Sequence, residues 1–481
     1  MKRIIRTSKQ KIIRTLRVKN QNITGTLAHL ISAASEAGAD IGTIKTVYLG
    51  ELYNIRDITV VANDKDHLKE IISRVRNVPG VTLKQIIDDV LEKHVGGKIK
   101  TAATYPVTSI DDLRKVYTPG VAEVCALIKR KPAQAFHYTS IQRNVALITN
   151  GSRVLGLGNL GPVASMPVME GKAALFSQLT GMNMFPVLID TRDPKEFVET
   201  VMKIHHGFGA IQLEDIESPA NFEIEDELIK RLNKPVMHDD QHGTAVVTLA
   251  ATINACRLVK KDLKQLKLGQ LGLGAAGQAI ALLLKAYTGN TVLGFDINEP
   301  ACEFYKKRGG KTASVEEIMK TCDLVVMTTG RKNLIKPDMI KKGQVILALS
   351  NPYPEITISD ALKAGAAFAF DGTRVNNLLG YPGIFKGSLI AQAKKITPEM
   401  MIAAAEAIAE TAPGREPLPN ALDPTVHDRV AQAVSKAAMD CQVAQVIPDS
   451  EEFQNRNAVD ELNDEDDDDD FDDDNDDDDL D

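Results

Sequence analysis

Within residues 12–87, the order of hydrophobic and polar positions predicts four strands and two helices. Alternation of apolar and polar side chains is typical of a half-buried strand, whereas apolar side chains three or four residues apart are typical of a helix. The predicted strands cover residues 12–18, 41–49, 53–62 and 81–87, and the predicted helices cover residues 26–36 and 66–76. A first domain with the element order βαββαβ is therefore expected over residues 1–95.

The order βαββαβ in a segment of this length is that of a ferredoxin-like fold, and the segment resembles an ACT domain. The resemblance rests on the turn that ends in Gly25, on the helix start Thr26-Leu27 with Leu30 one turn later, and on the run at 37–41. It implies a regulatory domain that binds an amino acid or another small effector and pairs between subunits. The expected effector site is the turn at 20–25 with the helix N-terminus that follows it. An oligomerisation module without a ligand is an equal alternative.

From residue 96 onward, short apolar runs alternate with helical stretches, which is typical of parallel sheets covered by helices. The runs predict two α/β domains, one over residues 96–255 and a Rossmann-type one over residues 256–445. The runs of the first domain are 145–149, 210–213 and 235–237, and those of the second are 268–271, 291–295, 323–329 and 344–350. Residues 446–481 are expected to form a disordered acidic tail, because so polar a segment cannot bury a core.

The first strand of the predicted Rossmann-type domain leads into a Gly-x-Gly-x-x-Gly pattern and then a helix. A second strand ends at Asp296, at the spacing expected for the acidic residue that binds the adenosine ribose hydroxyls. The residues expected to contact the dinucleotide are Gly272, Gly274, Ala275, Ala276 and Gly277. Asp296 would repel a 2′-phosphate, so we expect NAD as the cofactor. An arrangement in which the cations at 306–308 fold back toward such a phosphate stays open.

Two acidic pairs follow two strands of the α/β domain predicted over residues 96–255, and they mark it as the metal and substrate domain. Glu214-Asp215 comes directly after 210–213, and Asp239-Asp240 comes soon after 235–237. The carboxyl ends of parallel strands meet at one edge of a sheet, where active groups gather. Carboxylates that converge there require a cation, and oxygen ligands suit Mg²⁺ or Mn²⁺. Two solvated turns, each with an Asp that caps the next helix, are the simpler alternative, but the repetition of the pair favours a metal site.

Lys172 lies between a glycine-rich loop at 150–162 and the first acidic pair, within the run MEGKAALF that is expected to open a helix. A lysine at a helix start is ordinarily a solvated surface residue. Here Gly171 and an apolar run flank it, which favours partial burial. A partly buried lysine near a metal can have a lowered pKa and act as a base.

Five motifs in this order resemble the malic enzyme family: VYTPGVA at 116–122, GLGNLGP at 156–162, MEGKAALF at 169–176, IQLED at 211–215 and HDDQHGTA at 238–245. The resemblance is to the bacterial type and covers roughly residues 100–440. It implies metal-dependent oxidative decarboxylation of L-malate to pyruvate and CO₂ with reduction of NAD. Malolactic enzyme, which makes lactate without releasing NADH, is one alternative. A non-catalytic effector-binding protein is another, although the intact motifs argue against it.

The same resemblance implies roles for individual residues. The metal ligands would be Glu214, Asp215 and Asp240, with Asp239 behind them. Lys172 would take the proton of the malate hydroxyl, and Tyr117 would protonate the enolate of pyruvate. The substrate is expected to contact Arg153, Asn351 and Asn377, and Asn351 is also expected to lie near the nicotinamide.

Charge and composition limit the expected partners. The net charge is −8, but residues 461–481 hold 16 of the 65 acidic residues, which leaves 49 acidic against 57 basic residues elsewhere. The basic residues are dispersed among acids, which favours small anionic substrates over nucleic acid. No apolar run approaches the ~20 residues of a membrane span, the N-terminus lacks a secretory pattern, and the five scattered cysteines suggest reduced thiols. We therefore expect a cytoplasmic protein with no membrane partner. The resemblance to an ACT domain, which pairs between subunits, implies a homodimer or higher homo-oligomer.

Overall fold

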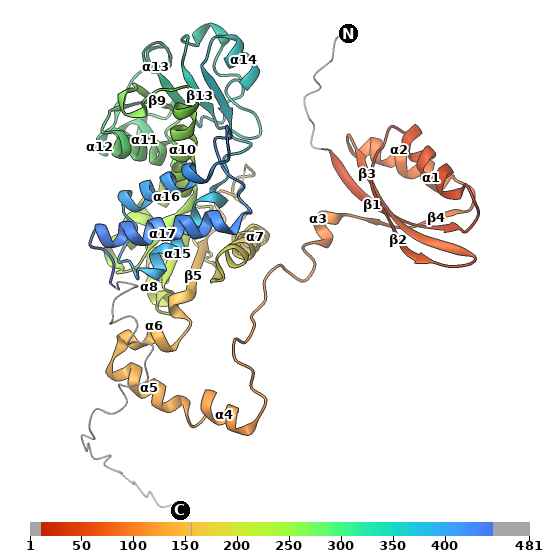
Figure 1. Ribbon diagram of the computed structural model, residues 1–481, viewed down its shortest axis with the longest axis horizontal. Coiled ribbons are helices and arrows are strands. Elements are labelled where there is room, and N and C mark those ends of the chain that lie inside the picture. Colours follow the sequence, from red (N-terminus) through yellow and green to blue (C-terminus); the bar gives the residue numbers. More distant parts are fainter. Residues whose placement is uncertain (1–10, 155, 446–481) are drawn as a thin grey trace, which may run out of the picture. The chain divides into compact units, whose positions relative to one another are not determined.

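The computed structural model describes residues 11–154 and 156–445 of the 481-residue chain. The chain divides into two compact units, Met1–Lys100 and Thr101–Asp481. One sheet belongs to the first unit and two sheets belong to the second (Figure 1). The predicted acidic tail at 446–481 lies outside the described residues.

The first unit has the element order βαββαβ that its sequence predicts (Figure 1). Its strands are β1 (Ile12–Gln21), β2 (Asp40–Leu49), β3 (Tyr53–Ala62) and β4 (Val81–Ile87). Its helices are α1 (Thr26–Glu36), α2 (Lys65–Arg76) and the short α3 (Asp89–Glu92). The strands pair in antiparallel fashion in the order β2-β3-β1-β4. The predicted ferredoxin-like order of elements is therefore confirmed.

Alternation along the strands explains how this unit buries its core. Side chains at every second position of a strand point to the same face of the sheet. Leu16 and Val18 on β1 and Ile58 on β3 are buried together with residues of α1 and α2, such as Leu30 and Ile71. The helices therefore pack on one face of the sheet, and β2 is left as a largely exposed edge strand.

The second unit begins with three helices, α4 (Ile110–Val116), α5 (Val121–Arg130) and α6 (Ala135–Tyr138), and none of them has a buried residue. A parallel sheet in the order β6-β5-β7-β8 follows. Its strands are β5 (Asn144–Thr149), β6 (Asn183–Leu188), β7 (Ala210–Leu213) and β8 (Val236–His238). One face buries its side chains against α7 (Pro162–Thr180) and α10 (Asp239–Leu258), and the other against α8 (Pro194–Ile204) and α9 (Ala220–Arg231).

The third sheet is parallel and has the order β11-β10-β9-β12-β13-β14. Its strands are β9 (Leu268–Leu271), β10 (Val292–Phe295), β11 (Lys311–Thr312), β12 (Leu324–Met327), β13 (Val345–Ala348) and β14 (Phe368–Asp371). The helices α11 (Ala275–Thr288) and α12 (Glu299–Lys307) cover one face, and α13 (Val315–Thr321) and α14 (Ile358–Lys363) cover the other. The strand order reverses between β9 and β12, which is where doubly wound sheets bind dinucleotides. The predicted Rossmann-type architecture is confirmed.

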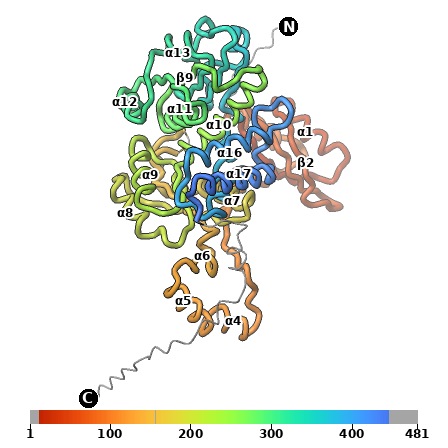
Figure 2. The backbone as a smooth tube through the Cα atoms, turned by 60° about the vertical axis from the view of Figure 1, so that its left-hand side comes forward, coloured from red at the N-terminus to blue at the C-terminus, as the bar shows by residue number. Residues whose placement is uncertain are grey.

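Three helices complete the second unit: α15 (Tyr381–Ile390), α16 (Pro398–Thr411) and α17 (Pro424–Asp440). They pack against α7 and α10, as the blue segments of Figure 2 show. Short 3₁₀ turns lie at Pro132–Gln134, Ile141–Arg143, His205–Gly207, Leu263–Gln265, Pro337–Met339 and Asn377–Leu379. Most residues of α10 are buried, because the helix lies between the two α/β parts and under α16.

One predicted helix boundary is wrong. The run MEGKAALF was expected to open a helix, but α7 begins at Pro162, so Lys172 lies in the middle of the helix. Proline suits the first turn of a helix because its φ is already helical and the missing N–H has no partner there. A second proline, Pro167, lies inside α7 and breaks the helical pattern in the sequence. No helix within residues 11–154 and 156–445 is long and apolar enough to cross a membrane.

Candidate active site

Three carboxylates converge at the carboxyl end of the β5–β8 sheet. Glu214 and Asp215 directly follow β7, and Asp240 lies in the first turn of α10, directly after β8. One oxygen from each can be chosen so that all three lie within 4.8 Å of one another. The N–H of Asp215 also donates to Oδ2 of Asp240 at 3.1 Å, which links the two strand ends. We call Glu214, Asp215 and Asp240 the acidic cluster.

Burial and mutual repulsion make the acidic cluster suited to a cation. Glu214 and Asp215 are 4% and 5% exposed. Burial raises the pKa of Glu214 well above its usual value; Lys172 counteracts this shift, and Asp240 and the neighbouring aspartates add to it. Oxygen donors this close together, two of them on buried carboxylates and one on the partly exposed Asp240, fit a hard divalent cation such as Mg²⁺ or Mn²⁺. The role of these residues as metal ligands stays a prediction.

Lys172 projects from α7 into the acidic cluster. Its Nζ lies 2.6 Å from Oε1 of Glu214 and 2.5 Å from Oδ2 of Asp239. Burial acts to lower the pKa of Lys172, but Asp239 and Glu214 outweigh burial and raise this pKa well above its usual value. This direction is opposite to the lowered pKa that the sequence suggested for a lysine beside a metal.

Tyr381 supports Lys172 and was not predicted from the sequence as a site residue. The Nζ of Lys172 lies 4.8 Å from the centroid of the Tyr381 ring, and the Tyr381 hydroxyl donates to the carbonyl oxygen of Lys172 at 3.1 Å. An aromatic face attracts an ammonium group, so the ring helps to hold Nζ in place. Burial raises the pKa of Tyr381. A tyrosine within Gly-Tyr-Pro-Gly was the available sequence signal.

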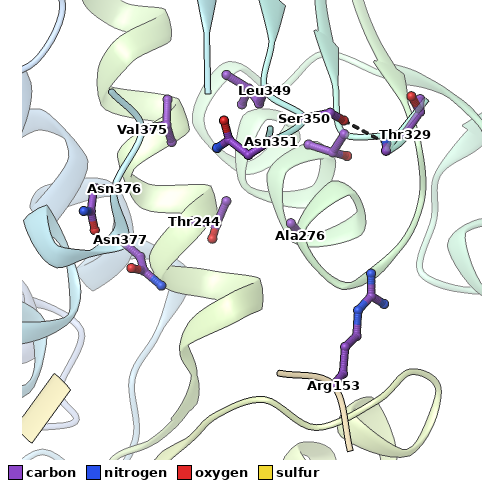
Figure 3. Close-up of a pocket in the computed structure, with 12 residues that line it drawn as sticks. Arg153, Thr244, Ala276, Thr329, Leu349, Ser350, Asn351, Val375, Asn376 and Asn377 are labelled. Atoms are coloured by element: carbon purple, nitrogen blue, oxygen red, sulfur yellow. Dashed lines mark hydrogen bonds between the residues drawn. The ribbon is translucent and has the colours of Figure 1, made fainter. Parts of the chain in front are cut away.

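A cavity of about 490 Å³ opens beside the acidic cluster. Its lining includes Lys172, the acidic cluster and residues 274–277 at the start of α11. It adjoins a second cavity of about 420 Å³, which is shown in Figure 3. The structure therefore brings the predicted base, metal ligands and dinucleotide loop to one place. Thr244, one turn along α10 from Asp240, lines both cavities and was not predicted.

The predicted substrate residues also meet at these cavities. Arg153 extends into the space from the glycine-rich loop, and Asn351 and Asn377 approach it from other segments (Figure 3). The N–H of Arg153 donates to the carbonyl oxygen of Asp215 at 3.0 Å, which fixes the loop beside the acidic cluster. Nδ2 of Asn351 donates to the carbonyl oxygen of Gly372 at 2.9 Å. A guanidinium and two amides at one cavity are suited to a dicarboxylate.

The dinucleotide loop has the geometry that its glycines predict. Gly272 has a φ of 90°, a left-handed conformation that favours glycine. A Cβ at Gly277 would overlap the carbonyl oxygen of Gly272, so helix and strand could not pack as closely with another residue there. The N-terminus of α11 has no side-chain cap, and space lies open beside Gly274. This end of the helix therefore fits a pyrophosphate.

Asp296 lies directly after β10, beside the dinucleotide loop. Its carboxylate accepts from the N–H of Leu273 at 2.6 Å and from the N–H of Asn298 at 2.8 Å. Two of the three nearby cations pair elsewhere: Lys306 with Glu303, and Arg308 with Asp226 of α9. This placement favours ribose hydroxyls over a 2′-phosphate.

Among the residues predicted to act in catalysis, Lys172 lines the cavity beside the acidic cluster and Tyr117 does not. Tyr117 follows α4, is 66% exposed, and is not among the described residues that line either cavity. The helices α4 and α5 on either side of it bury none of their residues. The motif VYTPGVA is present, but its contacts within this unit do not bring Tyr117 to Lys172.

Comparison with protein families identifies both α/β parts. The malic enzyme N-terminal domain family matches residues 96–229, and the malic enzyme NAD-binding domain family matches residues 338–446. Residues 237–344 match the NAD-binding domain of D-isomer specific 2-hydroxyacid dehydrogenases. The last match agrees with the dinucleotide loop at the start of α11.

Individual relatives agree with the family matches. The chain is 51% identical over 430 residues to NAD-dependent malic enzyme 1 of Bacillus subtilis, which covers 89% of this chain and 98% of the relative. It is 39% identical to the bifunctional malic/malolactic enzyme of the same organism, over 76% of this chain and 96% of the relative. The crystal structure of malic enzyme from Pyrococcus horikoshii superposes with a TM-score of 0.71 at 37% identity, over 74% of this chain and 92% of that one. The chain belongs to the malic enzyme family.

Proposed function

We propose that the chain catalyses the oxidative decarboxylation of L-malate to pyruvate and CO₂, with reduction of NAD and with a requirement for Mg²⁺ or Mn²⁺. The observation that carries the proposal is the single cavity lined by Lys172, the acidic cluster and the start of α11. A base, a metal site and a dinucleotide site must lie this close together for metal-assisted hydride transfer. The NAD-dependent malic enzyme of B. subtilis, at 51% identity, supports both the reaction and the cofactor.

The residues around the cavity bind and orient malate. The acidic cluster would hold the divalent cation, which supplies Lewis-acid polarisation of the malate hydroxyl and later of the C2 carbonyl. Arg153 pairs with a carboxylate of malate, in a bidentate fork where geometry allows. Asn351 and Asn377 donate to the remaining oxygens and turn the C2 hydrogen toward NAD. Asp239 stays bonded to Lys172 behind the acidic cluster.

Lys172 accepts the proton of the malate hydroxyl at Nζ while the C2 hydrogen leaves as hydride to NAD. This step requires the neutral amine. Asp239 and Glu214 raise the pKa of Lys172, and a bound cation would offset part of their negative charge. Lys172 then loses its proton more readily and can act as a base.

Tyr117 is proposed to protonate C3 of the enolate that remains after CO₂ departs. Its exposed position requires that α4 and α5 dock against another surface. Leu113, Val116 and Tyr117 are exposed apolar or aromatic residues on this segment, and exposed apolar groups of this kind mark an interface. We propose that the interface joins two copies of the chain, so that the enzyme is a homodimer or larger homo-oligomer and Tyr117 of one copy serves the cavity of the other.

Isotope transfer tests the proposed reaction directly. L-malate that carries deuterium at C2 should pass that deuterium to NAD and yield deuterated NADH together with pyruvate, because hydride leaves from C2. Mass spectrometry of the reduced nucleotide measures the transfer. Unlabelled NADH, or pyruvate formed without NADH, would contradict hydride transfer from malate.

Malolactic activity is a second candidate because one relative is a bifunctional malic/malolactic enzyme at 39% identity. In that reaction the hydride returns to pyruvate and gives lactate without net NADH. The proposal favours release of pyruvate, because the relative at 51% identity is an NAD-dependent malic enzyme.

Asp296 should set the choice between NAD and NADP. Asp296→Ser should raise the ratio of kcat/KM for NADP to that for NAD by roughly tenfold, since one charge repulsion against the 2′-phosphate is removed. Initial rates with each cofactor at fixed malate and Mn²⁺ give this ratio. A wild-type enzyme that already prefers NADP would overturn the ribose assignment.

The first unit is proposed to be an ACT-like regulatory or oligomerisation domain. Gly25, with a φ of 92°, precedes α1, and no side chain caps this helix. The turn at 20–25 and this helix start are the proposed effector site, for an amino acid or small carboxylate. The match to the B. subtilis enzyme spans 430 residues, more than residues 101–481 contain, so it includes part of the first unit.

Deletion of residues 1–95 should leave malate oxidation intact, because every residue at the cavity comes after residue 150.

An effector found in a thermal-shift screen of amino acids and organic acids should stabilise the full chain and shift its KM for malate. The same compound should have no effect on the truncated chain. Equal effects of the compound on both chains would place the effector site outside the first unit.

The domain limits are proposed as 1–95, 96–255 and 256–445, followed by the tail at 446–481. Helix α10 crosses the second limit, since it begins at the acidic cluster and ends before β9. A cytoplasmic location completes the proposal and follows from the scattered cysteines and the soluble substrates.

A further inference from the structure

Helix α9 lies between the two acidic strand ends in the sequence and contacts both α/β parts of the second unit. Successive residues of a helix point about 100° apart, so neighbouring residues can serve different partners. Glu225 contacts the start of α10, whereas Asp226 contacts the end of α12. The helix therefore connects the element that carries Asp240 with the element that follows Asp296.

Glu225 fixes the backbone that leads into the acidic cluster. It is 3% exposed and accepts from the N–H of His238 at 2.6 Å and from Nε2 of Gln241 at 2.9 Å. Nε2 of His242 lies 3.2 Å from the same carboxylate. These three partners flank Asp240 on both sides. A shift of Glu225 would therefore move the metal-binding turn.

On its other side, α9 contacts the end of α12. Nη2 of Arg308 donates to Oδ2 of Asp226 at 2.7 Å. The ring centroids of Phe222 and Phe304 lie 4.7 Å apart. The Arg308 guanidinium lies 4.4 Å from the Phe304 centroid and 5.3 Å from the Phe222 centroid. We call these four residues the aromatic clasp. Two rings under one guanidinium restrict its motion more than an exposed ion pair would.

The helix α12 is in turn attached to Asp296. The Sγ of Cys302 donates to the carbonyl oxygen of Asp296 at 3.5 Å, and the N–H of Asn298 donates to its carboxylate at 2.8 Å. Nε2 of Gln278 on α11 donates to the carbonyl oxygen of Ala301 at 3.3 Å. A change at the aromatic clasp would therefore reach the ribose end of the dinucleotide site.

We propose that α9 couples the acidic cluster to the dinucleotide site, with Phe222, Asp226 and Arg308 as positioning residues. The inference rests on the proposed function, in which a cation and NAD occupy one cavity. Ordering of Asp240 by a cation orders α9 through Glu225, and α9 orders α12 and Asp296 through the aromatic clasp. By thermodynamic linkage, bound NADH then tightens cation binding by the same factor that the cation tightens NADH binding.

A purely structural role of the aromatic clasp predicts something different. An ion pair that only holds two helices together changes the unfolding temperature and leaves the coupling between two ligands unchanged. The coupling factor, defined as the ratio of the Mn²⁺ dissociation constants without and with saturating NADH, is therefore the informative quantity.

The test measures free Mn²⁺ by its electron paramagnetic resonance signal in titrations of the full chain. A protein-free titration with NADH corrects for Mn²⁺ bound by the nucleotide. The variants are Asp226→Asn and Arg308→Met. The matched control is Asp428→Asn, because the pair Lys386–Asp428 has the same 2.7 Å distance and similar exposure, 23% and 54% against 28% and 52% for Arg308–Asp226.

We expect a coupling factor of about five or more for the wild type. Asp226→Asn and Arg308→Met should each lower this factor by about threefold or more toward one, and Asp428→Asn should retain it. Arg308→Lys keeps the charge but loses the planar stack on the rings, so its coupling factor should lie between those of the wild type and Arg308→Met. This variant replaces Arg308→Met in the test if Arg308→Met does not fold. An unchanged factor in both clasp variants, an equal loss in Asp428→Asn, or a wild-type factor of one overturns the inference. Failure of the wild type to bind Mn²⁺ or NADH would instead refute the proposed function.

Discussion

Replacement of Asp240 by alanine should abolish both malate oxidation and the decarboxylation of added oxaloacetate, each by on the order of a thousandfold. Both steps depend on a cation that polarises an oxygen of the substrate, which is worth several kcal/mol of charge stabilisation. Asp240 supplies one of three oxygens within 4.8 Å and also accepts from the N–H of Asp215, so its loss removes both a ligand and a link between the two strand ends. Separate assays of the two reactions at saturating Mn²⁺ measure the effect.

A control for this prediction is available in the same loop. Glu217, 39% exposed by its side chain and paired with Arg192, lies close to Asp215 in the sequence but is not part of the acidic cluster. Glu217→Gln should retain near-normal rates in both assays. Normal oxaloacetate decarboxylation by Asp240→Ala would remove Asp240 from the metal site and with it the proposed set of ligands.

Lys172→Ala and Tyr117→Phe should both be inactive in the full reaction but should fail at different steps. Lys172→Ala removes the base and the positive charge between Glu214 and Asp239, so hydride transfer in either direction should fall by at least about a thousandfold. Tyr117→Phe removes the proposed acid for the enolate and should still reduce added oxaloacetate with NADH. Equal loss of every partial reaction in both variants would contradict separate roles.

Mixing these two variants tests where Tyr117 acts. If Tyr117 of one copy serves the cavity of another, a hybrid of Lys172→Ala and Tyr117→Phe chains contains cavities with both an intact lysine and an intact tyrosine. Unfolding and refolding the two inactive variants together should therefore restore part of the malate oxidation. No recovery in hybrids that are shown to have formed would place Tyr117 and Lys172 of the same chain together.

The sequence predicted those parts of the site in which the functional residues directly follow a strand. Both acidic pairs follow strands, and parallel pairing of β7 with β8 is sufficient to bring Glu214, Asp215 and Asp240 together. The Gly-x-Gly-x-x-Gly pattern and Asp296 are also local features, and β9 pairs with β10 in the register that places them side by side. The hydrophobic period of the strands and the spacing of the motifs therefore predicted correctly which of these residues lie at the sheet edges.

Features that depend on packing between distant segments could not be predicted in this way. Tyr381 reaches Lys172 from more than two hundred residues away in the sequence. The contacts of α9 with α10 and α12 also require the folded arrangement, since Glu225 and Asp226 resemble any charged helical surface in the sequence. The start of α7 was misplaced because Pro162 and Pro167 interrupt the hydrophobic period that defines a helix.

The central claim is that one cavity oxidises malate with release of NADH and CO₂ in a metal-dependent reaction. The most direct measurement incubates the full chain with L-malate and NAD, with Mn²⁺ in one sample and a chelator in another, and quantifies NADH, pyruvate, lactate and CO₂ together. The account predicts equal amounts of NADH, pyruvate and CO₂ with Mn²⁺, little lactate, and no products with the chelator. Lactate and CO₂ formed without net NADH, or undiminished turnover in the chelator, would contradict it.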